Sequence, residues 1–115
     1  MPSYRLTMAY KETLQKKSVS QLIAIAVRHF HKFIRTRDKD LPCISCGRYT
    51  TLQAGHFYSA SNSSVRFNED NVNGQCIQCN HFLSGNLLPY RQNLIKKIGQ
   101  ERVDKITLNV EMSKK

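Results

Sequence analysis

The four cysteines of this 115-residue chain form two Cys-x-x-Cys pairs, Cys43 with Cys46 and Cys76 with Cys79. Each pair places two thiols on one tight turn, and two such turns can complete the tetrahedral shell of a structural Zn²⁺ ion. The 29 residues between the pairs exceed the usual spacing of a zinc ribbon, which indicates an inserted segment. Because four thiolates fill the shell, we expect this zinc to stabilise the fold and to offer no open position for chemistry.

Paired cysteines also occur in redox dithiols and in iron–sulfur clusters. A redox dithiol needs only one pair, on a strand-to-helix turn of a parallel sheet, and the sequence pattern lacks that context. The chain shows no apolar N-terminal segment typical of a secretion signal and no apolar run long enough to cross a bilayer. These features favour a cytoplasmic protein with reduced thiols and no membrane partner, in which paired cysteines bind metal more often than they form disulfides.

Positive charge is concentrated on the two flanks of the cysteine-containing segment. Lys and Arg outnumber Asp and Glu by 18 to 8, a net charge of +10. Residues 1–40 carry nine basic and three acidic side chains, residues 90–115 carry seven and three, and residues 41–89 carry two of each. This excess favours nucleic acid as a partner over anionic lipid, since no strongly apolar helix face is left for a membrane. The alternative is a basic protein whose charge only keeps it soluble.

The flanking elements must position the cysteine-containing segment within a single domain, residues 1–115. We expect a basic extension over 1–17, an amphipathic helix over 18–37, a zinc-containing core over 41–86 and C-terminal helices over 87–112. Ser18-x-x-Gln21 fits a capping box at the start of the amphipathic helix. Its apolar side should pack on the metal module or on a second subunit. Its polar side is either solvated or follows a DNA backbone, and it contains Arg28, His31, Lys32 and Arg35.

Short strands and turns are expected inside the core. The β-branched and aromatic content of Tyr49–Gln53 predicts a strand, with 65–67 as its partner and the Ser/Asn-rich stretch 58–64 as the connecting loop. Gly85-Asn86 marks a turn. Pro89 suits the first turn of the next helix and Gly99 suits its C-terminal cap. A final helix is expected over 101–109.

The order of the motifs between the two cysteine pairs resembles a zinc-stapled HNH (ββα-metal) endonuclease, an α+β fold. That order is Cys43-x-x-Cys46, Ala54-Gly55-His56, Asn71-Val72 and Cys76-x-x-Cys79-Asn80. Longer runs make the sequence closely similar to the NinG (Rap) proteins of lambdoid phages over roughly residues 20–107. These runs are Leu41-Pro42-Cys43-Ile44-Ser45-Cys46-Gly47, Arg66-Phe67-Asn68-Glu69-Asp70-Asn71, Gln75-Cys76, Ser84-Gly85-Asn86-Leu87 and Pro89-Tyr90-Arg91.

The resemblance implies a structure-specific endonuclease that cleaves branched recombination intermediates such as Holliday junctions and D-loops, in the cytoplasm of the phage host. Phosphodiester hydrolysis needs a base to activate water and a cation to offset charge on the phosphate. His56 is the candidate base, because its pKa lies near neutrality. Asn71 matches the asparagine that holds the hairpin loop and so orients the histidine. Asn80 matches the position that holds a ligand of the catalytic cation.

The expected catalytic cation is Mg²⁺ or Mn²⁺, distinct from the zinc. Many HNH nucleases have an acidic ligand directly before the base histidine, and this chain has Gly55 there. Asp70 and His81 are therefore further candidate ligands beside Asn80. Glu69 is also close enough in sequence to reach the catalytic cation. The competing interpretation is that Glu69 is an ordinary turn residue.

The basic residues around the core are candidates for contact with DNA phosphates without reading of sequence: Arg48, Arg66, Arg91, Lys96 and Lys97. A four-way junction needs two symmetric cuts, so we expect a possible homodimer through the apolar face of the helix over 20–35, and a phage recombinase as a further partner. Two alternatives stay open at this level: an HNH nuclease with another task, such as DNA packaging or duplex nicking, and a catalytically inactive zinc module that only binds DNA.

Overall fold

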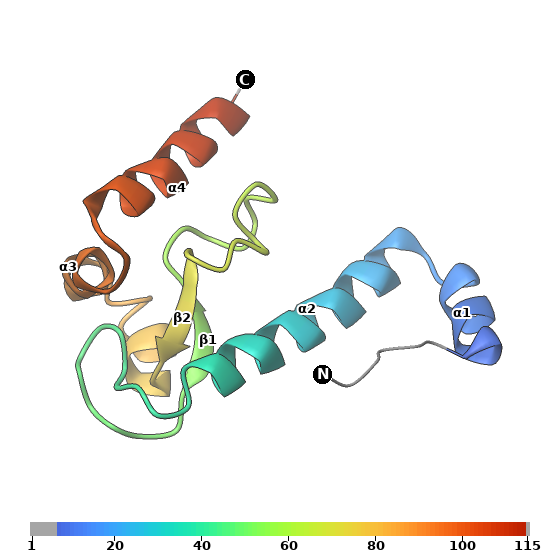
Figure 1. The fold of residues 1–115 in the computed structure, drawn as a ribbon, viewed down its shortest axis with the longest axis horizontal. Helices are drawn as coiled ribbons and strands as arrows, with labels where there is room; N and C mark the ends of the chain where they lie inside the picture. The colour runs from blue at the N-terminus through green and yellow to red at the C-terminus, as the bar shows by residue number, and fades with distance from the viewer. Residues whose placement is uncertain (1–6, 115) are drawn as a thin grey trace.

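A computed structural model describes residues 7–114 of the chain and shows a mixed α+β fold, as predicted. Figure 1 shows a small hairpin beside one long helix, with two C-terminal helices on its other side. The predicted extension over residues 1–17 contains a helix, and its residues 1–6 lie outside the described part. The elements in chain order are α1 (Met8–Gln15), α2 (Val19–Arg37), β1 (Gln53–His56), β2 (Val72–Gln75), the π-helical turn η1 (Gln78–Phe82), α3 (Leu87–Ile98) and α4 (Gln100–Ser113).

Helix α2 begins at the predicted capping box. The Ser18 hydroxyl accepts from the backbone N–H of Gln21 at 3.2 Å, and the Ser18 N–H donates to the Gln21 side chain at 2.8 Å. Its C-terminal half packs on the hairpin, where Ile34 is buried and Phe30 lies against Ala54 and Val72. Its N-terminal half extends away from the hairpin and carries α1 at its far end (Figure 1).

The apolar stripe of α2 is covered only where the helix meets the hairpin. Val19 is 73% exposed, Leu22 37% and Phe33 45%. Within residues 7–114, the expected packing of this helix on the cysteine-containing module is therefore confirmed only for its last turns. Among the described residues no helix is both long and apolar enough to traverse a lipid bilayer.

The predicted strand positions are wrong. The two-stranded antiparallel sheet pairs β1 with β2, with Gln53 opposite Gln75 and His56 opposite Val72. Tyr49 instead lies in an exposed connection, and Val65 is buried in the core as part of the loop between the strands. Tertiary packing determines where the strands form. Strand β2 is buried along its whole length, and this burial outweighs the low β-propensity of its Asn and Gly residues.

The main core lies between the first cysteine turn, the loop between the strands and the last two helices. Tyr90 and Leu94 of α3 meet Val103, Ile106 and Val110 of α4, together with Ile44 and Val65. The turn before α3 uses left-handed backbone at Ser84, Gly85 and Asn86, and Gly99 (φ 92°) separates α3 from α4, so both turn predictions are confirmed. Helix α4 extends beyond the predicted 101–109 at both ends.

Candidate metal centre and histidine site

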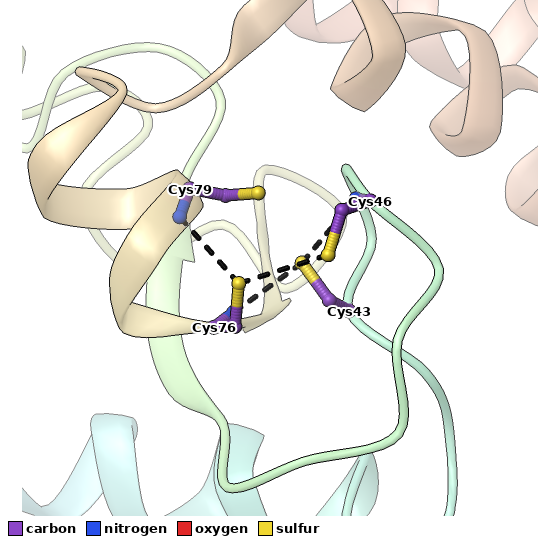
Figure 2. A group of neighbouring side chains, drawn as sticks. All are labelled: Cys43, Cys46, Cys76 and Cys79. Atoms are coloured by element: carbon purple, nitrogen blue, oxygen red, sulfur yellow. Dashed lines mark hydrogen bonds between the residues drawn. The ribbon is translucent and has the colours of Figure 1, made fainter.

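The four cysteine sulfur atoms converge on one point (Figure 2). Cys43 and Cys46 come from the loop after α2, Cys76 directly follows β2, and Cys79 lies in η1. All four Sγ atoms lie within 4.8 Å of one another, and those of Cys46 and Cys76 are 3.7 Å apart. Tetrahedral zinc with Zn–S bonds of about 2.3 Å requires S···S separations of roughly 3.8 Å. The cluster is therefore of the right size and donor type for a structural zinc.

Local hydrogen bonds lower the pKa of two of the thiols, Cys46 and Cys76. The backbone N–H of Cys76 donates to Cys43 Sγ at 3.3 Å, and that of Cys79 donates to Cys76 Sγ at 3.5 Å. Burial raises the pKa of the Cys46 thiol, but hydrogen bonds from Arg48 and from its cysteine neighbours outweigh this and bring it to about 6. Arg48, predicted to contact DNA, has its Nη2 atom 3.8 Å from Cys76 Sγ. Its charge thus offsets that of the thiolates.

His56 stands at the end of β1 on the face that meets α2. Its Nε2 atom lies 3.1 Å from the backbone oxygen of Arg66. A carbonyl oxygen can only accept, so Nε2 carries the proton and Nδ1 keeps its lone pair. Burial, together with the charge of Arg66, lowers the pKa of His56 and outweighs the opposing effect of this hydrogen bond. At neutral pH the imidazole is therefore neutral, with Nδ1 able to accept a proton.

Asn71 holds the loop that follows His56. Its Oδ1 accepts from the backbone N–H of Tyr58 at 2.8 Å, and its Nδ2 donates to the carbonyls of Tyr58 (3.0 Å) and Val65 (3.2 Å). The side chain is fully buried. Three hydrogen bonds from one amide tie both ends of the loop together, and the loop supplies the Arg66 carbonyl that orients His56. Asn71 thus fixes the conformation of this loop, and its role in orienting a catalytic histidine stays a prediction.

The position before His56 has no room for a side chain. A Cβ atom on Gly55 would lie 2.1 Å from Oε1 and 2.7 Å from Cβ of Gln75. Gln75 is itself buried and donates from Nε2 to Ser45 Oγ at 2.8 Å and to the Gly85 carbonyl at 2.6 Å. The glycine is therefore required by a buried amide that ties β2 to the first cysteine turn and to the turn before α3.

The other predicted cation ligands are dispersed. Asn80 on η1 donates to Gln53 Oε1 at 2.9 Å, at the opposite end of β1 from His56. Three residues of strand separate those ends by about 10 Å. Asp70 is paired with Arg102 of α4, and His81 is exposed beside Phe82. Within residues 7–114, the four cysteines are the only group of three or more His, Cys, Asp or Glu side chains close enough to hold one ion.

The predicted DNA-contact residues divide into two groups. Arg91 and Lys96 are exposed on α3. Arg66 donates from Nε to the Ala60 carbonyl at 2.9 Å, inside the loop between the strands. Lys97 has a structural partner, because its Nζ lies 2.7 Å from Asn73 Oδ1 and 3.3 Å from both carboxylate oxygens of Asp38.

Sequence reasoning missed two residues at this site. Asp38, which directly follows the predicted helix over 18–37 and was assigned no role, is buried where α2, β2 and α3 meet. His31, placed on the solvated or DNA-facing side of the helix, packs edge-on against His56 with ring centroids 5.7 Å apart. The signal for His31 was its position three residues before Ile34, which puts it near the face of α2 that packs on the hairpin.

Comparisons with known proteins agree with the sequence resemblance. The family model described as Bacteriophage Lambda NinG protein matches residues 5–115. Protein ninG of Escherichia phage lambda is 50% identical over 99 residues, which cover 84% of this chain and 48% of the relative. Protein ninG of Escherichia phage 933W is 50% identical over 84% of this chain and 49% of the relative. Protein ninG of Salmonella phage P22 is 48% identical over 81% of this chain and 47% of the relative.

The chain thus spans about half the length of the curated relatives that it matches. No solved structure matches it. The family model covers nearly the whole chain. The chain belongs to the NinG family.

Proposed function

We propose that this chain is a zinc-stapled HNH endonuclease that cleaves branched DNA recombination intermediates, such as Holliday junctions and D-loops, by metal-dependent phosphodiester hydrolysis in the host cytoplasm. The observation that carries the proposal is His56, whose Nε2 is bonded to the Arg66 carbonyl while Nδ1 keeps a lone pair. The surrounding order of hairpin, second cysteine pair and short helix supports it, because that order is the one expected for a ββα-metal nuclease.

His56 would act as the general base. Its Nδ1 accepts a proton from water as the water oxygen attacks phosphorus, and the bond from phosphorus to the leaving sugar oxygen breaks. Burial and Arg66 keep the pKa of the imidazole low enough for the neutral form to predominate at pH 7. A bound divalent cation, Mg²⁺ or Mn²⁺, would supply charge stabilisation for the phosphate. Asn71 contributes by holding the loop that orients the histidine.

Net positive charge supports DNA as the substrate. The chain carries +10, and Arg91 and Lys96 are exposed on α3 where phosphates can reach them. Each phosphate contact neutralised by a basic residue should make binding more sensitive to salt. The replacement of Arg91 and Lys96 by Ala should therefore reduce the slope of log affinity against log salt; an unchanged slope would exclude these residues from the interface.

A cleavage assay on a panel of linear, flapped and four-way DNA substrates tests the proposal. With Mg²⁺ or Mn²⁺, the native protein should cut branched substrates in preference to linear duplex, and His56→Ala should abolish cutting while folding and DNA binding persist. Equal cutting of linear duplex would favour a packaging or nicking nuclease. Binding without any cutting would indicate a non-catalytic zinc module. Cutting by the His56→Ala protein would refute the assignment of the base.

We also propose that the protein forms a two-fold dimer, which would present two active sites to a four-way junction. The exposed apolar stripe on the N-terminal half of α2, with Val19, Leu22 and Ile23, is the surface that supports this. Sedimentation with and without junction DNA should show a dimer that Leu22→Glu disrupts. A monomer under both conditions would defeat the proposal. A phage recombinase is a further proposed partner, to be sought by co-purification with the full-length relatives.

A further inference from the structure

We propose that His31 of α2 is a second functional histidine, which together with Arg35 and Arg66 forms a binding site for one DNA phosphate beside His56. The proposal rests on the proposed function for the identity of the anion. It goes beyond that function because α2 precedes the whole cysteine-containing module, and none of the motifs of the HNH pattern lies on it. The site would thus be shared between the module and the helix that flanks it.

The fold brings the two histidines together from distant parts of the chain. The ring of His31 lies edge-on to that of His56, with 5.7 Å between centroids and 62° between planes. Phe30 and Ile34 hold α2 against Ala54 and Val72 of the hairpin, so the approach is fixed by apolar packing. Both rings are only partly buried. An external ligand can therefore reach them.

The charged groups around the pair are all cationic. Burial lowers the pKa of His31, and the charges of His56 and Arg35 lower it further. Arg35 lies one helical turn after His31, and Arg66 approaches His56 from the loop between the strands. No carboxylate is among the groups that shift the pKa of either histidine in the described chain. Two guanidinium groups near the histidines, with no carboxylate among these groups, favour an anion at this place.

A phosphodiester fits this arrangement better than a carboxylate does. It offers two non-bridging oxygens on a tetrahedral centre, and arginine and imidazole N–H groups are its usual partners. A phosphate held here would also lie next to Nδ1 of His56, the nitrogen with the free lone pair. The proposed base and the proposed phosphate site then serve the same reaction, with His31 touching the substrate directly.

The competing explanation is that His31 only packs against His56 and steadies its ring. Two substitutions distinguish these roles. His31→Phe keeps an aromatic ring for edge-on packing and removes both nitrogens, whereas His31→Gln loses the ring and keeps an N–H donor. His29 provides a matched control, because it is an exposed histidine two positions away, about 200° around the same helix.

The first experiment is a titration of ¹⁵N-histidine-labelled protein with the phosphodiester thymidylyl-thymidine, without added divalent cation. The ring signals of His31 and His56 should move together and saturate at the same concentration, while those of His29 stay in place. Movement of the His56 signals with no movement of those of His31 would overturn the proposal. Ring signals that all stay in place would overturn it as well.

The second experiment measures binding of a four-way DNA junction to the variants by fluorescence anisotropy. His31→Phe should weaken binding about tenfold or more, the usual effect of losing a hydrogen bond to a charged group, and His29→Phe should not. His31→Gln should recover part of the loss. Native affinity in His31→Phe, at an unchanged melting temperature, would show a packing role and refute the phosphate site. If the dinucleotide titrates both histidines but native protein cuts no DNA, the proposed function fails and the phosphate site stands.

Discussion

Replacement of Asp38 should destabilise the protein more than replacement of any exposed acidic residue. Its carboxylate is 2% exposed and accepts from Arg37 Nε at 2.8 Å and Nη2 at 2.9 Å. It also accepts from the backbone N–H of Gly74 at 2.8 Å and from Lys97 Nζ at 3.3 Å. One side chain thus connects the end of α2 to β2 and α3. Removal of it takes one acceptor from each of two cations and leaves a buried N–H unpaired.

The expected loss of stability follows from the groups that lose their partner in Asp38→Ala. Breaking a buried ion pair costs about 3–5 kcal/mol, and a stranded buried N–H costs about 1–3 kcal/mol. The Arg37 and Lys97 side chains are 29% and 28% exposed, and both keep other acceptors, so water and these groups relieve part of the loss. We expect a decrease of about 3 kcal/mol in the free energy of unfolding, or roughly 12 °C in melting temperature for a domain of this size.

Urea denaturation followed by circular dichroism measures the loss, with Asp40→Ala as the control. Asp40 is an exposed aspartate two residues away, and its replacement should change stability by less than about 0.5 kcal/mol. If Asp38→Ala costs no more than Asp40→Ala, the argument for a central buried carboxylate is wrong.

Hydrogen bonds from Arg37 and Gly74, together with the charge of Lys97, outweigh burial and lower the pKa of Asp38. Its contribution should therefore be complete at pH 7. It should diminish as the pH falls below about 4, where the carboxylate of the unfolded chain protonates first, and it should be lost once the pH passes below the lowered pKa of the native carboxylate. Both variants lose zinc in acid alike, so the difference between their unfolding free energies isolates this effect.

Three further outcomes are expected. Cys76→Ser, or removal of zinc by a chelator, should abolish cooperative unfolding, because zinc binding on the order of 10 kcal/mol rivals the whole stability of a small domain; unchanged melting would argue against a structural zinc. The pH profile of cleavage should have its acidic limb below pH 6.5, since the pKa of His56 is lowered, and a limb above that value would contradict its environment. Gly55→Ala should cost about 1–3 kcal/mol in urea denaturation through overlap with Gln75, and Gln75→Ala should relieve part of that cost in the double variant.

Features determined by local chemistry were predictable from the sequence. The capping box at Ser18, the turn at Gly85-Asn86 and the cap at Gly99 each depend on a few neighbouring residues, and all three are observed. The four cysteines were also recognisable as a group, because their spacing reflects the geometry of one metal ion. In these cases the cause of the structure lies within a few residues or in a fixed coordination shell.

The strands were placed wrongly because their cause is not local. Tyr49–Gln53 has the composition of a strand, yet the chain pairs Gln53–His56, which includes Ala and Gly, with Val72–Gln75. The pairing depends on contacts across the fold, such as Asp38 to Gly74 and the Tyr90 hydroxyl to the Gly55 carbonyl at 2.7 Å. His31 was misplaced for a related reason, since helical periodicity does not specify which polar residue meets a histidine from another element.

The close contact at Gly55 bears on how a cation could be held in the proposed nuclease. A carboxylate at this position would have to displace Gln75, whose amide binds the first cysteine turn and the Gly85 carbonyl, so its absence follows from the packing beside the cysteine cluster. Asp70 is engaged by Arg102, and Asn80, the remaining amide among the predicted ligands, is bonded to Gln53.

Neutral amides bind Mg²⁺ weakly, and this ion is usually held by one or two carboxylates together with substrate phosphates. A catalytic cation would therefore depend on the DNA for most of its negative ligands and would bind the free protein poorly. Under that condition the proposed phosphate site at His31 and Arg35 gains importance, because these side chains could donate hydrogen bonds to a phosphate before any cation is present. In the proposed nuclease, the glycine before His56 and the histidine on α2 would then be two parts of one arrangement, in which the protein would bind the phosphate before the cation.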